Sequence, residues 1–142
     1  MDTLRDKAAI VGIGETSYSR NSGMSDLALL LQAAVRAIED AELTPKDIDG
    51  IIPGFTGPPA EDFIGNFGSN DIKYTATIHM GGASAVASLQ SAATAVATKV
   101  ATNVLCVTGW NGCSGTKVSA GIDQLQLPIA QLMDFELPYG IL

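Results

Sequence analysis

An uncharged stretch from Tyr74 to Thr98 constrains the fold of this chain more than any other feature, because it contains no Asp, Glu, Lys or Arg. Its later part, residues 81–99, consists mainly of Ala, Ser, Thr and Val and predicts a helix. A helix that has no charged face is one that other protein surfaces surround on all sides. The sequence therefore predicts a central buried helix around which the other elements are built.

The predicted helix opens with two glycines, Gly81 and Gly82. Glycine has no Cβ, so a ligand can approach the backbone closely, and the first N–H groups of a helix are free at the positive end of its dipole. Such a helix start favours an oxyanion or a thioester carbonyl. We therefore expect Gly81, Gly82 and Ala83 to bind substrate.

Four apolar runs predict strands, and helices are predicted between them. The first run, Ala8–Gly14, is almost continuously apolar and is typical of a strand covered on both faces. Ser25 is a good N-cap for an amphipathic helix that extends to about Glu42. The βαβαβαβ pattern predicts an α/β fold with a mostly parallel sheet and helices on both faces. The remaining predicted elements are a capped turn at 44–47, strands at 51–52, 73–79 and 103–109, and a short helix within 60–68.

Gly12 and Gly14 resemble the start of a dinucleotide-binding fingerprint. However, Ser17 occupies the third glycine position, and a polar loop from Thr16 to Gly23 precedes the next helix. The context does not fit, so we do not expect a dinucleotide here.

Charge and composition exclude several classes of function. The net charge is −7 and no Lys/Arg cluster is present, which argues against nucleic acid or an anionic membrane as partner. Residues 1–7 have no apolar core of a secretory signal, and glycines and hydroxyl side chains interrupt the uncharged stretch, so we expect a cytoplasmic protein without a membrane span. The two cysteines, Cys106 and Cys113, make no metal pattern.

The apolar content of 46% with only 16% charged residues suggests that the chain is part of something larger. Regular periodicity is lost from Trp110 onward. We predict a domain over residues 1–115 and the truncated start of a loop or insertion region over residues 116–142.

Four segments taken in order resemble the N-terminal half of a thiolase-fold protein. The resemblance is strongest to the sterol-carrier-protein-x thiolases and the related lipid-transfer-protein aldolases of steroid side-chain degradation. It covers nearly the whole chain but only about the first third of the family's usual length. The segments are 9–16 (AIVGIGET), 43–51 (LTPKDIDGI), 81–84 (GGAS) and the strand at 104–109.

In that family a nucleophilic cysteine lies at the start of the corresponding helix, where the dipole and amides activate its thiol. Matching the family's Asn-Cys-x-x-Gly helix start to this sequence places Gly82 at the cysteine position. Its neighbours Gly81 and Ala83 are not nucleophiles either. The resemblance therefore implies that the thiolase acyl-enzyme step does not occur here.

Three other side chains are secondary catalytic candidates. Ser84 would need an adjacent base to act as a nucleophile, and the only histidine is His79 on the preceding strand. The structural interpretations are that Ser84 satisfies a free amide in the first turn and that His79 is a hydrogen-bonded core or interface residue. Cys113 could face a cleft at the strand ends, although no positive group lies nearby in sequence. Cys106, in mid-strand, is expected to be a core side chain.

The leading hypothesis is a thiolase-like lyase that cleaves a carbon–carbon bond of a steroid or other bulky β-hydroxyacyl-CoA by a retro-aldol route. Coenzyme A is then part of the substrate, and no bound cofactor is expected. The alternatives are an acyltransferase of the acetyl-CoA acetyltransferase type and a non-catalytic acyl-binding or scaffold subunit. The resemblance also implies acid/base groups in the C-terminal half, a homodimer through the strand Tyr74–His79, and an OB-fold, zinc-ribbon partner subunit.

Overall fold

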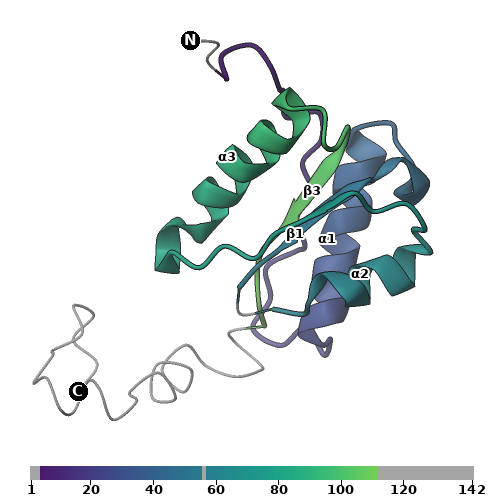
Figure 1. Cartoon of the computed structure of the whole chain (residues 1–142). Helices are drawn as coiled ribbons and strands as arrows, with labels where there is room; N and C mark the ends of the chain where they lie inside the picture. The colour runs from purple at the N-terminus through teal and green to yellow at the C-terminus, as the bar shows by residue number, and fades with distance from the viewer. Residues whose placement is uncertain (1–3, 56, 112–142) are drawn as a thin grey trace, which may run out of the picture.

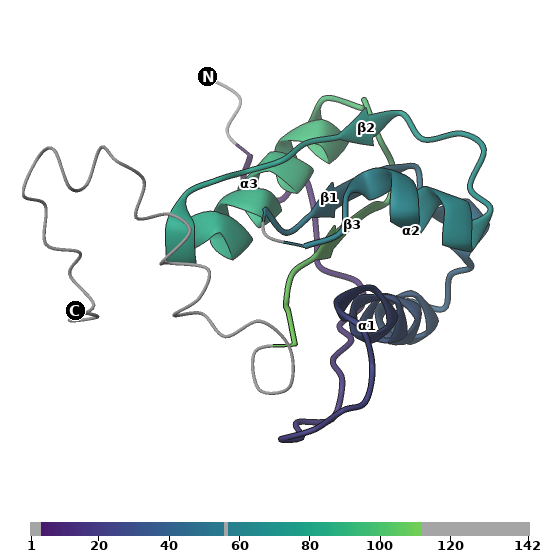
Figure 2. The same cartoon turned by 90° about the horizontal axis from the view of Figure 1, so that it is seen from below.

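A computed structural model describes residues 4–55 and 57–111, and these form three layers (Figure 1). A parallel sheet lies in the middle, with one helix on one face and two on the other, as the view from below also shows (Figure 2). The strands are β1 (Gly50–Pro53), β2 (Tyr74–Thr75) and β3 (Val104–Val107), in the order β2-β1-β3. The helix on the first face is α3 (Ser84–Ala97), and those on the second are α1 (Asp26–Asp40) and α2 (Ala60–Phe67). The predicted α/β architecture is confirmed.

Strand β1 is the centre of the described sheet, and all four of its residues are buried. It pairs with β3 along its whole length, from Gly50 opposite Val104 to Pro53 opposite Val107. The predicted strand at 73–79 is too long, because only Tyr74 and Thr75 form a regular ladder with β1. In the same register Pro53 would lie opposite Thr77, and proline has no N–H to donate. Pairing resumes at one bridge between Gly54 and Ile78.

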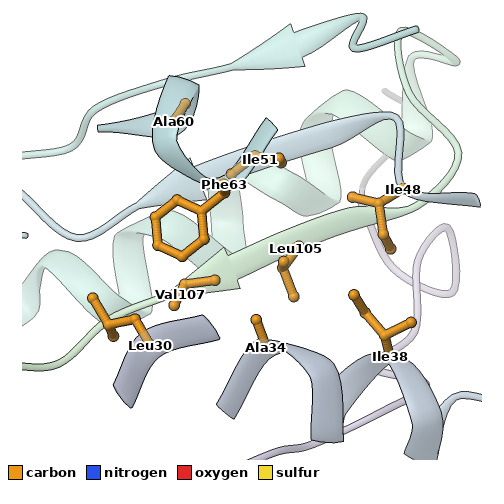
Figure 3. Close-up of a cluster of buried hydrophobic side chains, with 9 residues drawn as sticks. All are labelled: Leu30, Ala34, Ile38, Ile48, Ile51, Ala60, Phe63, Leu105 and Val107. Atoms are coloured by element: carbon orange, nitrogen blue, oxygen red, sulfur yellow. The ribbon is translucent and has the colours of Figure 1, made fainter. Parts of the chain in front are cut away.

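The hydrophobic core lies between the sheet and the two helices α1 and α2 (Figure 3). Helix α1 contributes residues spaced by four, which therefore lie on one face of the helix. Phe63 of α2 and Ile51 of β1 are fully buried. Figure 3 shows the members of this core: Leu30, Ala34, Ile38, Ile48, Ile51, Ala60, Phe63, Leu105 and Val107.

The ends of the first helix and of the turn that follows it are fixed by side chains predicted from the sequence. The Ser25 hydroxyl caps α1 by accepting a hydrogen bond from the Ala28 N–H at 3.2 Å. A 3-10 turn, Pro45–Asp47, carries a capping box in which Asp47 accepts from the Thr44 N–H at 2.8 Å. Both predictions are confirmed: Ser25 fixes the start of α1, and the capping box fixes the turn between α1 and β1.

The segment from Ala8 to Gly14 is not a paired strand in the described part of the chain, contrary to the sequence prediction. The side chains of Ile10, Val11 and Ile13 are 68%, 64% and 74% exposed, so the run is not covered on both faces. The prediction is wrong for the described residues, because their sheet consists of β1, β2 and β3 alone and residues 8–14 form no ladder with it.

The same segment packs against α1 instead, through its two glycines. A Cβ on Gly12 would lie 2.2 Å from the Ala37 carbonyl oxygen, and one on Gly14 would lie 2.1 Å from the Ala33 carbonyl oxygen. The Asp40 carboxylate accepts the Ile13 N–H at 2.9 Å. The Gly12-x-Gly14 pair therefore serves close packing of backbone on helix.

Asp49 ties together the amino ends of the three strands. Its carboxylate accepts the N–H groups of Thr102 and Asn103 at 2.8 Å each, ahead of β3. Lys73, which precedes β2, lies 3.5 Å from the same carboxylate. Burial alone would raise the pKa of Asp49, but the two amide hydrogen bonds and the lysine charge outweigh it, and the pKa lies below its usual value.

We expect Asp49→Asn to lower the free energy of unfolding by about 1.5–3 kcal/mol at neutral pH, the range for hydrogen bonds to charged groups. A carboxylate whose pKa is lowered by folding stabilises the protein fully above its unfolded pKa of about 3.9. That contribution is lost as the pH falls from there through the lower pKa of the folded state. Urea unfolding between pH 2 and 7 should show a smaller acid dependence in the variant.

The matched control is Asp71→Asn, because Asp71 pairs with the same lysine at 3.3 Å but its side chain is 84% exposed. Exposed ion pairs contribute about 0–1 kcal/mol, so this variant should unfold close to the wild type. Equal losses in the two variants would contradict the role given to Asp49.

Helix α3 covers one face of the sheet but is not enclosed by the described residues. Only Ser84, Ser88 and Ala95 are buried, whereas Val86 is 71% and Leu89 45% exposed. The expected burial on all sides is therefore not met within residues 4–55 and 57–111, because the side of α3 that faces away from the sheet has no described element over it. Residues 116–142 and Cys113 lie outside the described residues, so the predicted boundary at 115 stays a prediction.

Candidate functional site

The predicted helix start is a separate 3-10 turn, Gly81–Ala83, that leads directly into α3. Gly81 adopts a φ of +57°, a conformation in which glycine is favoured. Gly82 has no such requirement, and a Cβ added to it would have no heavy atom within 4 Å. The structure of the described residues therefore does not itself explain the glycine at position 82.

Ser84 fixes this turn. Its side chain hydroxyl accepts the Met80 N–H at 2.9 Å and donates to the Gly81 carbonyl oxygen at 2.7 Å. The residue is 6% exposed. Both hydrogen bonds close the turn and neither involves His79. They therefore favour a structural role for Ser84 over a role as a nucleophile.

Two backbone N–H groups at the turn are free to bind a ligand. The Ala83 N–H bonds the Met80 carbonyl oxygen at 3.2 Å, and the Ser84 N–H bonds that of Gly81. The N–H groups of Gly81 and Gly82 have no acceptor among the described residues. Both precede a helix of 14 residues, whose dipole favours negative charge at this end.

A cavity of about 150 Å³ lies beside the turn, between α3 and the carboxyl ends of β1 and β3. Helix α3 contributes Ser84, Ser88 and Leu89, and the strands contribute Ile52 and Cys106. Its lining is mainly apolar, which suits the hydrocarbon part of a ligand whose polar end lies at the turn.

Cys106 is half-buried in the wall of this cavity, and burial raises the pKa of its thiol to about 11. Its Sγ lies 3.7 Å from the Ser88 carbonyl oxygen, to which it donates. A thiol with a raised pKa is a poor nucleophile. The structure thus agrees with the predicted structural role for Cys106.

His79 lies at the carboxyl end of the segment that follows β2, three residues before Gly82. It is exposed, so it is not a core residue of the described part of the chain, and its place at an interface stays a prediction. Its imidazole stacks on the Phe55 ring, with 4.4 Å between ring centroids and 25° between planes. The sequence analysis did not select Phe55. Phe55 and His79 are brought together by the bridge between Gly54 and Ile78, which the sequence does not reveal.

A larger cavity of about 320 Å³ lies elsewhere, between residues 14–22, α1 and residues 108–111. Hydroxyl side chains and Trp110 line much of it. Asn111 closes one side by donating its N–H to Asp26 at 2.7 Å and its side-chain amide to the Met24 carbonyl oxygen at 2.8 Å. None of the predicted site residues that the structure describes lines this cavity.

The described residues contain neither a metal-binding cluster nor a membrane-spanning helix. No group of three or more His, Cys, Asp or Glu side chains in this part of the chain could hold a metal ion. Likewise, none of the helices described here is long and apolar enough to cross a membrane.

Comparison with known proteins gives both a fold and a set of relatives. No protein-family model matches the chain. Two variants of OleA from Xanthomonas campestris, a thiolase-fold protein, align with 61% and 57% of the chain at TM-scores of 0.54 and 0.50, with 18% and 20% identity. At this identity the likeness concerns the fold alone, and the described residues have a thiolase-like α/β fold.

The relatives by sequence are an aldolase and a lyase. The chain is 38% identical over 122 residues to a steroid side-chain-cleaving aldolase of Thermomonospora curvata, and 36% identical over 146 residues to the 17-hydroxy-3-oxo-4-pregnene-20-carboxyl-CoA lyase of Mycobacterium tuberculosis. The solved Ltp2-ChsH2 aldolase covers 89% of the chain at a TM-score of 0.74 and 36% identity. The chain is a homologue of these thiolase-like, lipid-transfer-type aldolases, which confirms the resemblance predicted from the sequence.

The alignments cover most of this chain but only a part of each matched protein. They include 85% and 97% of this chain but only 31% and 37% of the two curated relatives, and 34% of the solved aldolase. The chain thus spans about a third of the length of the proteins that it matches.

Proposed function

We propose that the chain is part of a thiolase-like lyase that cleaves a carbon–carbon bond in a β-hydroxyacyl-CoA, and that the acyl group is a steroid or a similarly bulky one. The observation that carries this proposal is the open Gly81–Ala83 turn at the start of α3, in a homologue of aldolases of which one is a carboxyl-CoA lyase. Coenzyme A enters as part of the substrate.

The proposed reaction is a retro-aldol cleavage. A base removes the proton of the β-hydroxyl group, the bond between Cα and Cβ breaks, and its electron pair forms the enolate of the shortened thioester. A proton then adds to Cα, so the products are a ketone or aldehyde and a shorter acyl-CoA. We propose that the base and the acid are supplied by residues outside this chain.

The turn would act on the charge that develops in this reaction. The free N–H groups of Gly81 and Gly82 suit the thioester oxygen, which becomes negative as the enolate forms. Donors fixed in advance stabilise such charge without reorganising during the reaction. The glycine at position 82 leaves room for the thioester and offers no nucleophile, which favours cleavage without a covalent acyl-enzyme.

Assembly with other subunits completes the proposal. The Ltp2-ChsH2 aldolase contains two named components, which supports a partner subunit here, and we propose that it is of the OB-fold, zinc-ribbon type. Within the described residues β2 is an edge strand of the sheet, which supports a homodimer through Tyr74–His79, because edge strands offer unpaired backbone groups. We also retain the cytoplasm as the proposed location.

The direct test is an assay of the complete protein, with its co-encoded partner, on a steroid β-hydroxyacyl-CoA. We expect a ketone and a shortened acyl-CoA in equal amounts, identified by mass spectrometry, and no acyl adduct on the intact protein. Thiolysis of a β-ketoacyl-CoA that is lost in Cys113→Ala would instead indicate an acyltransferase. Partner binding without turnover of either substrate would indicate a scaffold subunit.

A further inference from the structure

Phe55 and His79 form an aromatic contact near the start of α3, and the proposed reaction gives neither residue a role. Strand β1 ends at Pro53, and the bridge from Gly54 to Ile78 keeps the two chain segments side by side past that end. Phe55 and His79 are the next residues on each segment, and their rings stack at 4.4 Å. Pairing of the backbone thus sets the position of both rings.

The stack leaves the hydrogen-bonding edge of the imidazole available. Phe55 covers one face of the ring, and the stack does not cover the ring edge, where the two nitrogens lie; His79 is exposed. Neither nitrogen has a hydrogen-bond partner among residues 4–55 and 57–111. A neutral imidazole carries one N–H donor and one acceptor. His79 is also the only histidine in the 142 residues of the chain.

From this geometry we infer that His79 donates a hydrogen bond to the substrate thioester oxygen, next to the Gly81 and Gly82 amides, and that Phe55 is a positioning residue that holds the imidazole for this contact. The inference rests on the proposed function. The hydrogen bond strengthens as negative charge develops on the oxygen, so it acts mainly on the chemical step. No covalent bond to His79 forms.

Kinetics of the complete protein with its partner test this role. We expect His79→Leu to lower kcat about 100-fold, the usual effect of removing one such donor, with KM changed less than about threefold. Phe55→Leu should lower kcat about tenfold, and Phe55→Tyr should restore it because a ring is kept. The matched control is Phe67→Leu, which alters an aromatic contact between Phe67 and Phe63 within α2 and should leave kcat unchanged.

A double-mutant cycle separates positioning from general damage to the fold. If Phe55 acts through His79, Phe55→Leu has no further effect on kcat when His79 is already Leu. If the double variant instead loses kcat by the product of the two single-variant factors, the two residues act independently and the inference is overturned. A Phe55→Leu protein that is as active as Phe67→Leu would also overturn it.

A spectroscopic readout keeps the inference testable if the proposed reaction is wrong. The imidazole signals of His79, assigned by comparison with His79→Leu, are followed by NMR while butyryl-CoA, which has no β-hydroxyl group to cleave, is added. We expect these signals to shift in the wild type and in Phe55→Tyr, and to shift less in Phe55→Leu. Signals that do not respond to saturating butyryl-CoA would overturn the contact, whereas absent turnover with a clear shift would count only against the cleavage reaction.

Discussion

Gly14→Ala should destabilise the protein by about 3 kcal/mol or more, at the upper end of the range for overpacked sites. The added methyl group would lie 2.1 Å from the Ala33 carbonyl oxygen and 2.4 Å from the Ala37 backbone nitrogen. Both are backbone atoms of α1, so no side chain can rotate away, and residues 8–16 must leave the helix. Denaturant unfolding of the complete protein should show the loss as a lower midpoint.

Gly65→Ala is the matched control for this change. Gly65 lies within α2, and a Cβ there would have no heavy atom within 4 Å. Alanine is favoured over glycine inside a helix by about 0.5–1 kcal/mol, so this variant should be as stable as the wild type or slightly more stable. A Gly14→Ala protein that unfolds like Gly65→Ala would show that residues 8–16 do not pack on α1 as described.

Gly82→Val is expected to abolish most activity while leaving the fold intact. A Cβ at position 82 would have no described heavy atom within 4 Å, so we expect the free energy of unfolding to change by no more than about 0.5 kcal/mol. In the proposed complex, however, the valine would occupy the space of the thioester beside the free amides. We expect kcat/KM for the β-hydroxyacyl-CoA to fall at least about 100-fold, as for loss of an oxyanion contact.

The loss of activity should increase with the size of the side chain at position 82. Gly82→Ala adds a single carbon and should lose less activity than Gly82→Val. The control on the same helix is Gln90→Val, because Gln90 is exposed and lies two turns away from the glycines. Unchanged activity in Gly82→Val would exclude a close approach of the substrate to this residue.

Local patterns were sufficient to predict most helices and strands, because caps and apolar spacing act over a few residues. Ser25 and the Thr44–Asp47 box mark real helix ends, and the spacing in α1 matches its buried face. The segment at 8–14 could not be predicted in the same way. Its apolar run indicates a strand, but whether a strand pairs depends on a neighbour that is distant in sequence.

The candidate site was predictable in part for the same reason. The paired glycines before an uncharged helix indicated the position of the Gly81–Ala83 turn. The place of Ser84 just after this turn indicated a capping role. The stack of Phe55 on His79 could not be found, since it depends on the register between two segments that are 24 residues apart. The lining of the cavity beside α3 likewise depends on how that helix lies on the sheet.

The two ends of the sheet offer different freedom for protein engineering. Asp49 acts at the amino end of β1, whereas the Gly81–Ala83 turn and Phe55 lie at its carboxyl end. The four residues of β1 separate these regions by about 10 Å, at about 3.3 Å per residue, and mutations at this distance usually have additive effects. Under the proposed function, libraries at positions 55, 79 and 82 can therefore be screened for new acyl groups in a background stabilised elsewhere, without the two sets of changes interfering.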